Sequence, residues 1–228
     1  MKVVAFIFAR GNSKGIKNKN LVKINGKSLL ERAILVAKKS KYISDVYVST
    51  DSKKILNLSK KLKIITPFIR PKKLSTDSSP EILAWKHAVH YLYLNNIKTD
   101  YIVSIPTTSP LRTSKDVDRC INKAINTNVD ILFAVTPSSK NPFFNMIKIN
   151  KNNSIELLMK PKKLIYNRQS APKVFDLTTV CYVFKTNYIR NTNNIFSGKT
   201  GYAVIPKERA LDIDSYYDLK IAKKLIKK

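Results

Sequence analysis

The chain of 228 residues contains only two cysteines and no long uncharged hydrophobic segment. Cys120 and Cys181 lie far apart, with no Cys-x-x-Cys motif or neighbouring histidine, so the sequence indicates neither a disulfide framework nor a zinc site. We expect both thiols to be small core residues. No segment approaches the roughly 18 apolar residues that span a bilayer, and the N-terminal VVAFIF is too short for a signal sequence. We therefore expect a cytoplasmic protein with no membrane partner.

Acidic residues are also scarce: 15 aspartates and glutamates stand against 43 lysines and arginines, and the formal net charge is +28. This charge raises the alternative of a lysine-rich nucleic-acid-binding protein, because cations release counterions from phosphates. Only eight of the 43 basic residues are arginines, the preferred residue for reading bases, and the lysines are spread over the whole chain. We interpret most lysines as solvated surface and predict no nucleic-acid partner.

Apolar segments alternate with helical patterns along the chain, as in a parallel sheet covered by helices. Ser28 and Ser114 are the expected N-caps of two helices. The predicted strands are 3–8, 46–49, 64–68, 101–105, 131–135, 180–184 and 202–205, and further helices are predicted at 53–62, after Ser79-Pro80 and at 215–226. We predict one α/β domain over residues 1–228, with a Rossmann-like, mostly parallel sheet and helices on both faces.

The alternation fails between Pro137 and Asp176, where prolines, lysines and asparagines crowd together. An insertion of some forty residues within one sheet is the simplest layout. Its composition fits either a lid or a contact between subunits.

A basic loop with two glycines, ARGNSKGIKNKN at 9–20, follows the first predicted strand. In a parallel sheet the ligand crevice lies beyond the carboxyl ends of the strands, where this loop begins. Gly11 and Gly15 allow backbone N–H groups close to a ligand, while Arg10 and Lys14 add charge; together they suit a polyphosphate. Neither a GxGxxG motif nor a complete Walker A motif is present, so by pattern alone the loop could also be an ordinary turn.

This loop resembles the opening of the acylneuraminate cytidylyltransferases, or CMP-sialic acid synthetases, a family that includes legionaminic and pseudaminic acid cytidylyltransferases. Further matches follow in family order at Val48-Ser49-Thr50-Asp51, Arg70-Pro71 with Leu74 and Asp77, Thr108-Ser109-Pro110-Leu111-Arg112, Arg168-Gln169 with Pro172, and Asp212-Ile213-Asp214 with Asp218. The resemblance implies a fold of the nucleotide-diphospho-sugar transferase type. It also implies transfer of CMP from CTP to the anomeric hydroxyl of a nine-carbon 3-deoxy-2-ketosugar acid, with release of pyrophosphate.

The same resemblance implies a nucleotide site. Its expected residues are Arg10, Gly11, Asn12, Ser13, Lys14, Asn20 and Arg70. Asn20 and Arg70 would hold the ribose and the cytosine. Arg10, Lys14 and Asp214 are the expected catalytic residues, and Lys14 would stabilise the charge that develops on the α-phosphoryl group and the departing pyrophosphate. The sequence identifies no general base.

Asp212 and Asp214 are the predicted ligands of Mg²⁺, or of Mn²⁺, the cofactor that the resemblance implies. Residues i and i+2 of an extended segment point to the same face, so both carboxylates could meet one cation that bridges CTP oxygens. From spacing alone, the alternative is an aspartate pair that caps the final helix before Ser215. Asp218 is expected to brace the start of that helix.

The predicted sugar-binding residues are Ser109, Arg112, Arg168, Gln169 and Tyr182, the last three in register for a carboxylate clamp. Three positions depart from the sialic acid enzymes, which usually carry Gln where this chain has Pro106, Arg where it has Asp176 and Asn where it has Thr178. These departures concern the acceptor and leave the reaction type unchanged. Legionaminic or pseudaminic acid is then as suitable an acceptor as N-acetylneuraminic acid, and another ulosonic acid such as 3-deoxy-manno-octulosonate is the alternative.

The inserted segment 137–179 also gains a role from the resemblance. In the family it contacts a second subunit and completes the neighbouring sugar site, and the apolar residues at 137–144 suit such a contact better than a free loop. The expected partners are CTP, an acidic ketosugar and a second copy of the chain.

Overall fold

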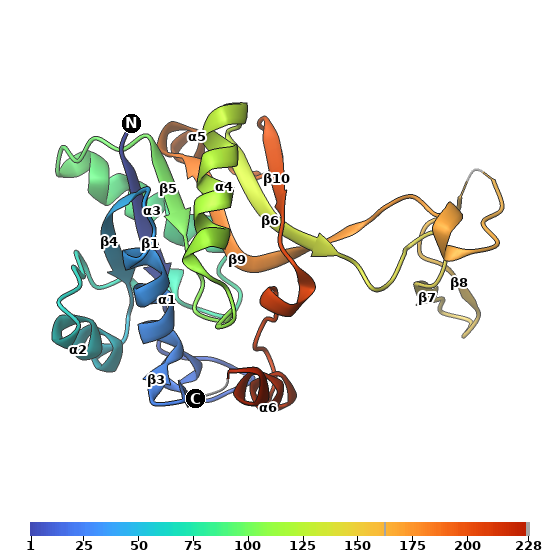
Figure 1. The fold of residues 1–228 in the computed structure, drawn as a ribbon, viewed down its shortest axis with the longest axis horizontal. Helices are drawn as coiled ribbons and strands as arrows, with labels where there is room; N and C mark the ends of the chain where they lie inside the picture. Colours follow the sequence, from blue (N-terminus) through green and yellow to red (C-terminus); the bar gives the residue numbers. More distant parts are fainter. Residues whose placement is uncertain (162, 227–228) are drawn as a thin grey trace.

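The computed structural model describes residues 1–161 and 163–226. Its centre is a six-stranded sheet with the strand order β10-β6-β9-β5-β1-β4 (Figure 1). The strands are β1 (Val3–Phe8), β4 (Ile43–Ser49), β5 (Tyr101–Ser104), β6 (Ile131–Pro137), β9 (Phe175–Lys185) and β10 (Thr200–Val204). The pairs β1–β4, β1–β5 and β10–β6 are parallel, whereas β9 runs antiparallel to both its neighbours, β5 and β6. The predicted mostly parallel sheet is confirmed.

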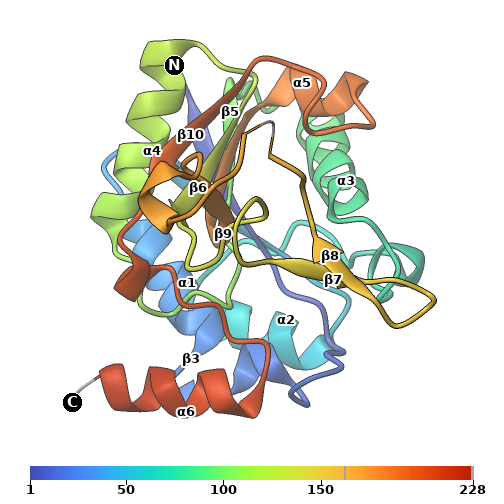
Figure 2. The same ribbon diagram turned by 90° about the vertical axis from the view of Figure 1, so that its right-hand side faces the viewer.

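Helices cover both faces of this sheet, as predicted. These helices are α1 (Leu29–Lys38), α2 (Lys53–Lys61), α3 (Glu81–Leu94), α4 (Ser114–Thr127) and α5 (Thr186–Asn191), whereas α6 (Tyr216–Leu225) packs in a separate core described below. Buried residues of α1 and α4 share one core cluster with the sheet, and those of α3 and α5 share another. Figure 2 shows α4 and α3 on opposite sides of the strands. The predicted core thiols, Cys120 and Cys181, are both fully buried.

Local capping chemistry explains where three helices begin. Ser28, Thr113 and Ser215 each accept a hydrogen bond from the backbone N–H three residues later, and the acidic side chain at that later position accepts from the cap's own N–H. This reciprocal pair satisfies two of the backbone donors that a helix start leaves free. The predicted cap at Ser114 is thus wrong by one residue, because Thr113 forms the capping box with Asp116.

The predicted strand at 64–68 is not formed. Only two isolated parallel bridges occur there, Tyr47 with Ile65 and Thr50 with Ile69. Pro67 lies between them and has no backbone N–H to donate to a ladder, so the segment follows the edge of β4 without becoming a seventh strand.

The inserted segment forms an arm that leaves the sheet after β6 and returns at β9 (Figure 1). It contains a short antiparallel hairpin, β7 (Ile147–Ile149) and β8 (Ile155–Leu157). The end of the predicted insertion, 175–179, belongs to the sheet because β9 begins at Phe175. Large apolar side chains of the arm are exposed at Ile147, Ile149, Ile155, Leu158, Met159, Leu164 and Tyr166.

A third, smaller core brings the C-terminal segment against the first loop. Ile213 packs there with Leu219 and Ala222 of α6 and with Ile16 and Leu29. Burial of Ile213 therefore carries its two flanking aspartates to the end of β1, although they lie about two hundred residues away along the chain.

Within residues 1–161 and 163–226, no helix has both the length and the apolar character that crossing a membrane would require.

Candidate active site

A cavity of about 500 Å³ lies beyond the carboxyl ends of β1 and β5. We call it the nucleotide cavity after the predicted nucleotide-binding residues in its lining, which consists of Phe8, Arg10, Ser13, Lys14, Gly15, Lys19, Asn20, Arg70, Leu74, Thr76, Asp77, Ser79, Glu81, Ala84, Pro106, Thr107, Thr108 and Asp214. Five predicted nucleotide-binding residues are among them. Ligands of open α/β sheets bind at such crevices.

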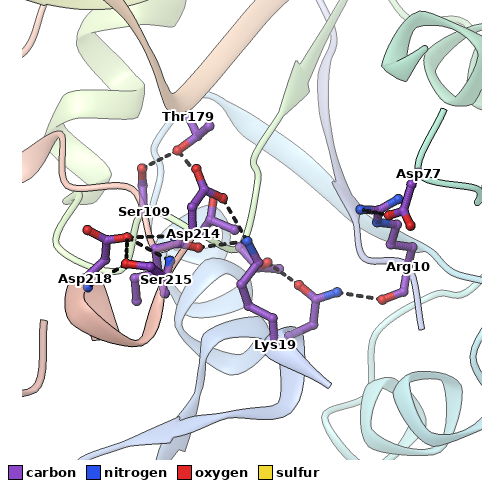
Figure 3. A network of polar contacts seen from close by, with 12 residues as sticks. Arg10, Lys19, Asp77, Ser109, Thr179, Asp214, Ser215 and Asp218 are labelled. Atoms are coloured by element: carbon purple, nitrogen blue, oxygen red, sulfur yellow. Dashed lines mark hydrogen bonds and ion pairs between the residues drawn. The ribbon is translucent and has the colours of Figure 1, made fainter. Parts of the chain in front are cut away.

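Asp77 positions the two cations of the first loop that face the cavity. The Arg10 guanidinium contacts the Asp77 carboxylate at 2.7 Å and also donates to the backbone oxygen of Thr76 at 3.0 Å (Figure 3). Lys14 Nζ lies 3.6 Å from the other Asp77 oxygen, and its side chain is 80% exposed. The sequence match included Asp77 without assigning it a role. Its carboxylate holds two positive groups at the cavity, where triphosphate oxygens could take its place.

Asn20 ties the first loop to the loop after β5. Its side-chain Nδ2 donates to the backbone oxygen of Arg10 at 2.7 Å, and its Oδ1 accepts from the Thr107 hydroxyl. Because both ends of the amide already have protein partners, the structure shows Asn20 fixing the shape of the cavity. The predicted contact with the ribose stays a prediction.

The two glycines of the loop act differently from one another. The backbone N–H of Gly11 donates to Asp51 Oδ1 at 2.8 Å, and the predicted contact of Gly11 with the nucleotide stays a prediction. Neither Gly11 nor Asn12 lines the nucleotide cavity. Gly15 does line it, and a Cβ at this position would lie 2.3 Å from the backbone oxygen of Asp214. A glycine is needed at 15 because the C-terminal segment crosses the loop there.

Lys19 is a site residue whose importance the sequence reading missed. Its ammonium donates to the backbone oxygen of Ile213 at 2.8 Å and to Asp214 Oδ1 at 3.0 Å, and its side chain is only 15% exposed (Figure 3). The available signal was its place beside Asn20 in the family match, which a background of 35 lysines obscured. Lys19 joins the metal-site candidate to the first loop.

Asp212 and Asp214 face different surroundings. Asp214 lines the nucleotide cavity and its side chain is 77% exposed, whereas Asp212 has one carboxylate oxygen buried without a hydrogen-bond partner. The segment belongs to no strand of the sheet, and the predicted shared face of the two carboxylates stays a prediction. Among the described residues, no group of three or more histidines, cysteines and acids could hold a metal. Mg²⁺ commonly takes only one or two carboxylates together with substrate phosphates, and an unpartnered buried carboxylate oxygen fits that role. Asp218 caps α6 through Ser215, as expected.

Arg70 reaches the nucleotide cavity from the segment after β4. The residue is only 5% exposed, its backbone N–H donates to the oxygen of Thr50 at 2.8 Å, and its side-chain Nε donates to Ser75 Oγ at 3.0 Å. Burial lowers the pKa of its guanidinium, and the nearby Asp51 partly opposes this. Arg70 is thus a held cation with unused donors at the cavity.

A second cavity, of about 420 Å³, lies beside the first. This acceptor cavity, as we call it below, is lined by Pro80, Glu81, Ile82, Trp85, Leu177, Tyr182, Asn193, Asn194, Ile195 and Phe196. Tyr182 is the one predicted sugar-binding residue there, and burial raises the pKa of its phenol. Helix α3 and the segment after α5 supply most of the wall, which no sequence motif indicated.

The other predicted sugar-binding residues lie elsewhere. Ser109 is fully buried and its hydroxyl is 2.8 Å from that of Thr179. The Arg112 guanidinium is buried against the backbone oxygens of Pro106, Thr179 and Val180, and burial lowers its pKa to about 10. In this position Arg112 holds the loop after β5 to strand β9 and does not line either cavity.

The arm carries Arg168 and Gln169 away from Tyr182. Both line a third cavity at the base of the arm, where Arg168 donates to the backbone oxygen of Ser138 at 3.0 Å. The predicted clamp of Arg168, Gln169 and Tyr182 is therefore not assembled within one chain.

Known proteins match this chain over nearly its full length. A family model for cytidylyltransferases matches residues 4–214. The chain is 31% identical over 228 residues to the CMP-N,N'-diacetyllegionaminic acid synthase of Campylobacter jejuni, covering 99% of this chain and 95% of the relative. It is 30% identical over 231 residues to the post-translational flagellin modification protein B of Campylobacter coli, again covering 99% and 95%.

Among solved structures, CMP:2-keto-3-deoxy-manno-octonic acid synthetase complexed with CTP has a TM-score of 0.74 at 13% identity, covering 99% of this chain and 98% of that one. At this identity the likeness shows the fold, and it confirms the predicted nucleotidyltransferase architecture. The family match confirms the resemblance found in the sequence and the prediction of a nucleotidyltransferase. The chain belongs to the cytidylyltransferase family.

Proposed function

We propose that this cytidylyltransferase uses CTP and a nine-carbon ulosonic acid of the legionaminic or pseudaminic type. The observation that carries the proposal is the pair of adjoining cavities: one lined by Arg10, Lys14, Lys19 and Arg70, the other by mostly apolar side chains. The cationic cavity suits a triphosphate. The apolar one suits the acetamido groups of a diacetylated sugar, of the kind named in the Campylobacter jejuni relative.

In the proposed reaction the anomeric hydroxyl of the sugar attacks the α-phosphorus of CTP. A P–O bond forms to the sugar oxygen, whose proton passes to solvent, while the bond from the α-phosphorus to the bridging oxygen of the β-phosphate breaks and pyrophosphate leaves with that electron pair. Lys14 is the freest cation at the cavity, because its side chain is 80% exposed and its contact with Asp77 is long at 3.6 Å. It can move to the phosphates and stabilise charge that grows in the transition state. Arg10 holds the triphosphate from its position beside Asp77.

Asp212 and Asp214 are the residues that would hold Mg²⁺, or Mn²⁺. Bound there, the ion would neutralise charge on CTP oxygens. Lys19 holds Asp214 at the rim of the cavity through its 3.0 Å contact, and burial of Ile213 fixes the backbone between the two carboxylates. The support for this assignment is the buried, unpartnered oxygen of Asp212 beside an exposed carboxylate.

The direct test is pyrophosphate release from each nucleoside triphosphate with Mg²⁺ and a panel of acids. The panel contains N,N'-diacetyllegionaminate, pseudaminate, N-acetylneuraminate and 3-deoxy-manno-octulosonate. We expect turnover with CTP and a preference for the first two acids, because octulosonate has no acyl group to place against apolar walls. Preference for octulosonate or N-acetylneuraminate would refute the proposed acceptor. No pyrophosphate with CTP and any acid would refute the proposed function.

We further propose that two chains share their acceptor sites through the arm, as a homodimer. The arm exposes a row of large apolar side chains, such as Ile149 at 72% and Tyr166 at 83%, a feature of interaction surfaces. Arg168 and Gln169 lie on the same arm, outside the acceptor cavity of their own chain. A second copy would let these polar residues reach a sugar carboxylate.

Complementation between two inactive variants tests this assembly. We expect Lys14→Ala and Arg168→Ala each to be weakly active, and their refolded mixture to recover about a quarter of wild-type activity. Half of the randomly formed dimers would be mixed, and each would have one intact site. No recovery, or a fully active monomer by light scattering at micromolar concentration, would contradict the proposal.

The predicted location in the cytoplasm stays a prediction.

A further inference from the structure

Glu81 occupies the junction between the two cavities. It is the first residue of α3, and it is the one residue that lines both the nucleotide cavity and the acceptor cavity within the described chain. A carboxylate in the first turn of a helix has an ordinary role, since it interacts favourably with the free N–H groups there. The contacts of Glu81 go further than that role requires.

The carboxyl group of Glu81 is held by the wall of the acceptor cavity. Trp85 Nε1 donates to Glu81 Oε1 at 3.2 Å. The Trp85 indole is only 2% exposed and packs 4.8 Å from the ring of Phe184 and 5.3 Å from that of Tyr182. Glu81 as a residue is exposed through the cavities, yet its carboxyl group lies against a buried aromatic cluster. The Ser104 hydroxyl also interacts with this carboxyl group, and because a carboxylate has about four acceptor sites, it can still accept a hydrogen bond from a ligand.

Among the described acidic residues that line the nucleotide cavity, Glu81 is the one that forms no ion pair. Three acidic residues line the nucleotide cavity, and Asp77 is paired with Arg10 while Asp214 is paired with Lys19. None of the ion pairs in the part of the chain that the structure describes involves Glu81. Burial raises the pKa of this carboxyl group, against the opposing effects of the Trp85 hydrogen bond, the charge of Arg70 and a hydrogen bond with Ser104. An acceptor with unused capacity at such a place is suited to a ligand.

We propose that Glu81 is a specificity-determining residue that accepts a hydrogen bond from a hydroxyl or acetamido N–H of the acceptor sugar. The bond from Trp85 holds the carboxyl group toward the acceptor cavity, which favours the sugar over the ribose of CTP as its ligand. In its ionised form Glu81 also repels the sugar's own carboxylate, so the acid binds with that group turned toward the cations. This inference rests on the proposed function, because it supplies the orientation that transfer to the anomeric hydroxyl requires.

The experiment uses Trp85, the single tryptophan of the chain, as a reporter next to Glu81. Wild type, Glu81→Ala, Glu81→Gln and the control Glu208→Gln are titrated with CTP and with N,N'-diacetyllegionaminate while Trp85 fluorescence is recorded. The KM values for both substrates are measured in parallel. Glu208 is a suitable control because its side chain is 70% exposed and it lies outside both cavities.

We expect Glu81→Ala to raise the KM for the sugar by about tenfold or more and to leave the KM for CTP within twofold, because one hydrogen bond to a charged group is lost. Glu81→Gln keeps an acceptor oxygen and should lie between Glu81→Ala and wild type. Glu208→Gln should match wild type.

Two results would overturn the role of Glu81. A raised KM for CTP with an unchanged KM for the sugar would assign Glu81 to the ribose, and unchanged values for both would leave it a helix-capping residue. If no pyrophosphate is released by the wild type, the proposed function fails, but fluorescence still decides the role of Glu81. A Trp85 response to the sugar that Glu81→Ala loses would support it, and no response in the wild type to any acid of the panel would refute it.

Discussion

Replacement of Gly15 by alanine tests the contact on which the whole site depends. The new Cβ would lie 2.3 Å from the backbone oxygen of Asp214, and ordinary contact begins at 3.4 Å, so the two segments must separate by about 1 Å. Overpacking of this kind costs about 1 to 3 kcal/mol when the surroundings cannot yield. Because Asp214 supplies the oxygen that the new Cβ would meet, separation of the two segments would displace Asp214 from the cavity. A displacement of about 1 Å at a reacting centre can cost about 10²-fold in rate.

We therefore expect Gly15→Ala to lower kcat for pyrophosphate release by about 10²-fold. Its free energy of unfolding should fall by no more than the cost of overpacking, about 1 to 3 kcal/mol. The matched control is Gly26→Ala. Its Cβ meets nothing within 4 Å, but its φ of +76° disfavours any side chain, so it should lose about 1 kcal/mol of stability and keep its activity. Thermal melting and steady-state kinetics on both variants separate the two effects. If Gly15→Ala keeps its activity within threefold, the close crossing of the loop and the Asp214 segment does not position the site.

Three other variants test the roles of single side chains. Lys14→Ala should lower kcat by about 10² to 10³ with nearly unchanged stability. The control Lys17→Ala, at an exposed neighbouring residue, should keep the wild-type kcat. A loss of only a few-fold in Lys14→Ala would remove Lys14 from the mechanism. Arg112→Ala should lower the free energy of unfolding by about 3 kcal/mol, because three backbone oxygens lose a buried donor. A fully stable variant with a raised KM for the sugar would instead support the predicted role of Arg112 in sugar binding. Asp116→Asn should cost about 2 kcal/mol at pH 7 in urea unfolding. Burial alone would raise the pKa of Asp116, but hydrogen bonds from Arg209 and Thr113 outweigh it and lower the pKa, so this stabilisation is present above the ordinary value of 3.8 and is lost as the pH falls below it. A difference between wild type and Asp116→Asn that does not shrink at low pH would contradict that assignment.

Several features of the fold could be predicted from the sequence because they depend on neighbours along the chain. The apolar run of β1 and the capping residue Ser28 are local signals, and both are where the pattern placed them. The strand predicted at 64–68 failed because strand formation depends on a partner as well as on composition, and Pro67 removes a donor. The N-cap of α4 is Thr113 where Ser114 was predicted, because both residue types can cap a helix and the backbone conformation determines which of them does.

The candidate site divides in a similar way. The residue types that line the nucleotide cavity, among them Arg10 and Lys14, were readable from one contiguous loop and its family match. The hydrogen-bond partner of each backbone and side-chain group could not be predicted from that loop. The N–H of Gly11 is taken by Asp51, and the guanidinium of Arg112 by backbone oxygens 67 and 68 residues away.

The sequence by itself therefore determined the reaction class, the alternation of strands and helices, and the basic loop at the end of the first strand. Each of these follows from short segments whose residue types indicate their structure or function without knowledge of the tertiary contacts. The tertiary structure alone decided that Lys19 holds Asp214 across 195 residues, that Gly15 must be a glycine, and that Glu81 stands between the two cavities. The physical reason is that burial and hydrogen bonding between distant segments assign each polar group its partner, and the residues next to that group in the chain do not specify which distant group this is.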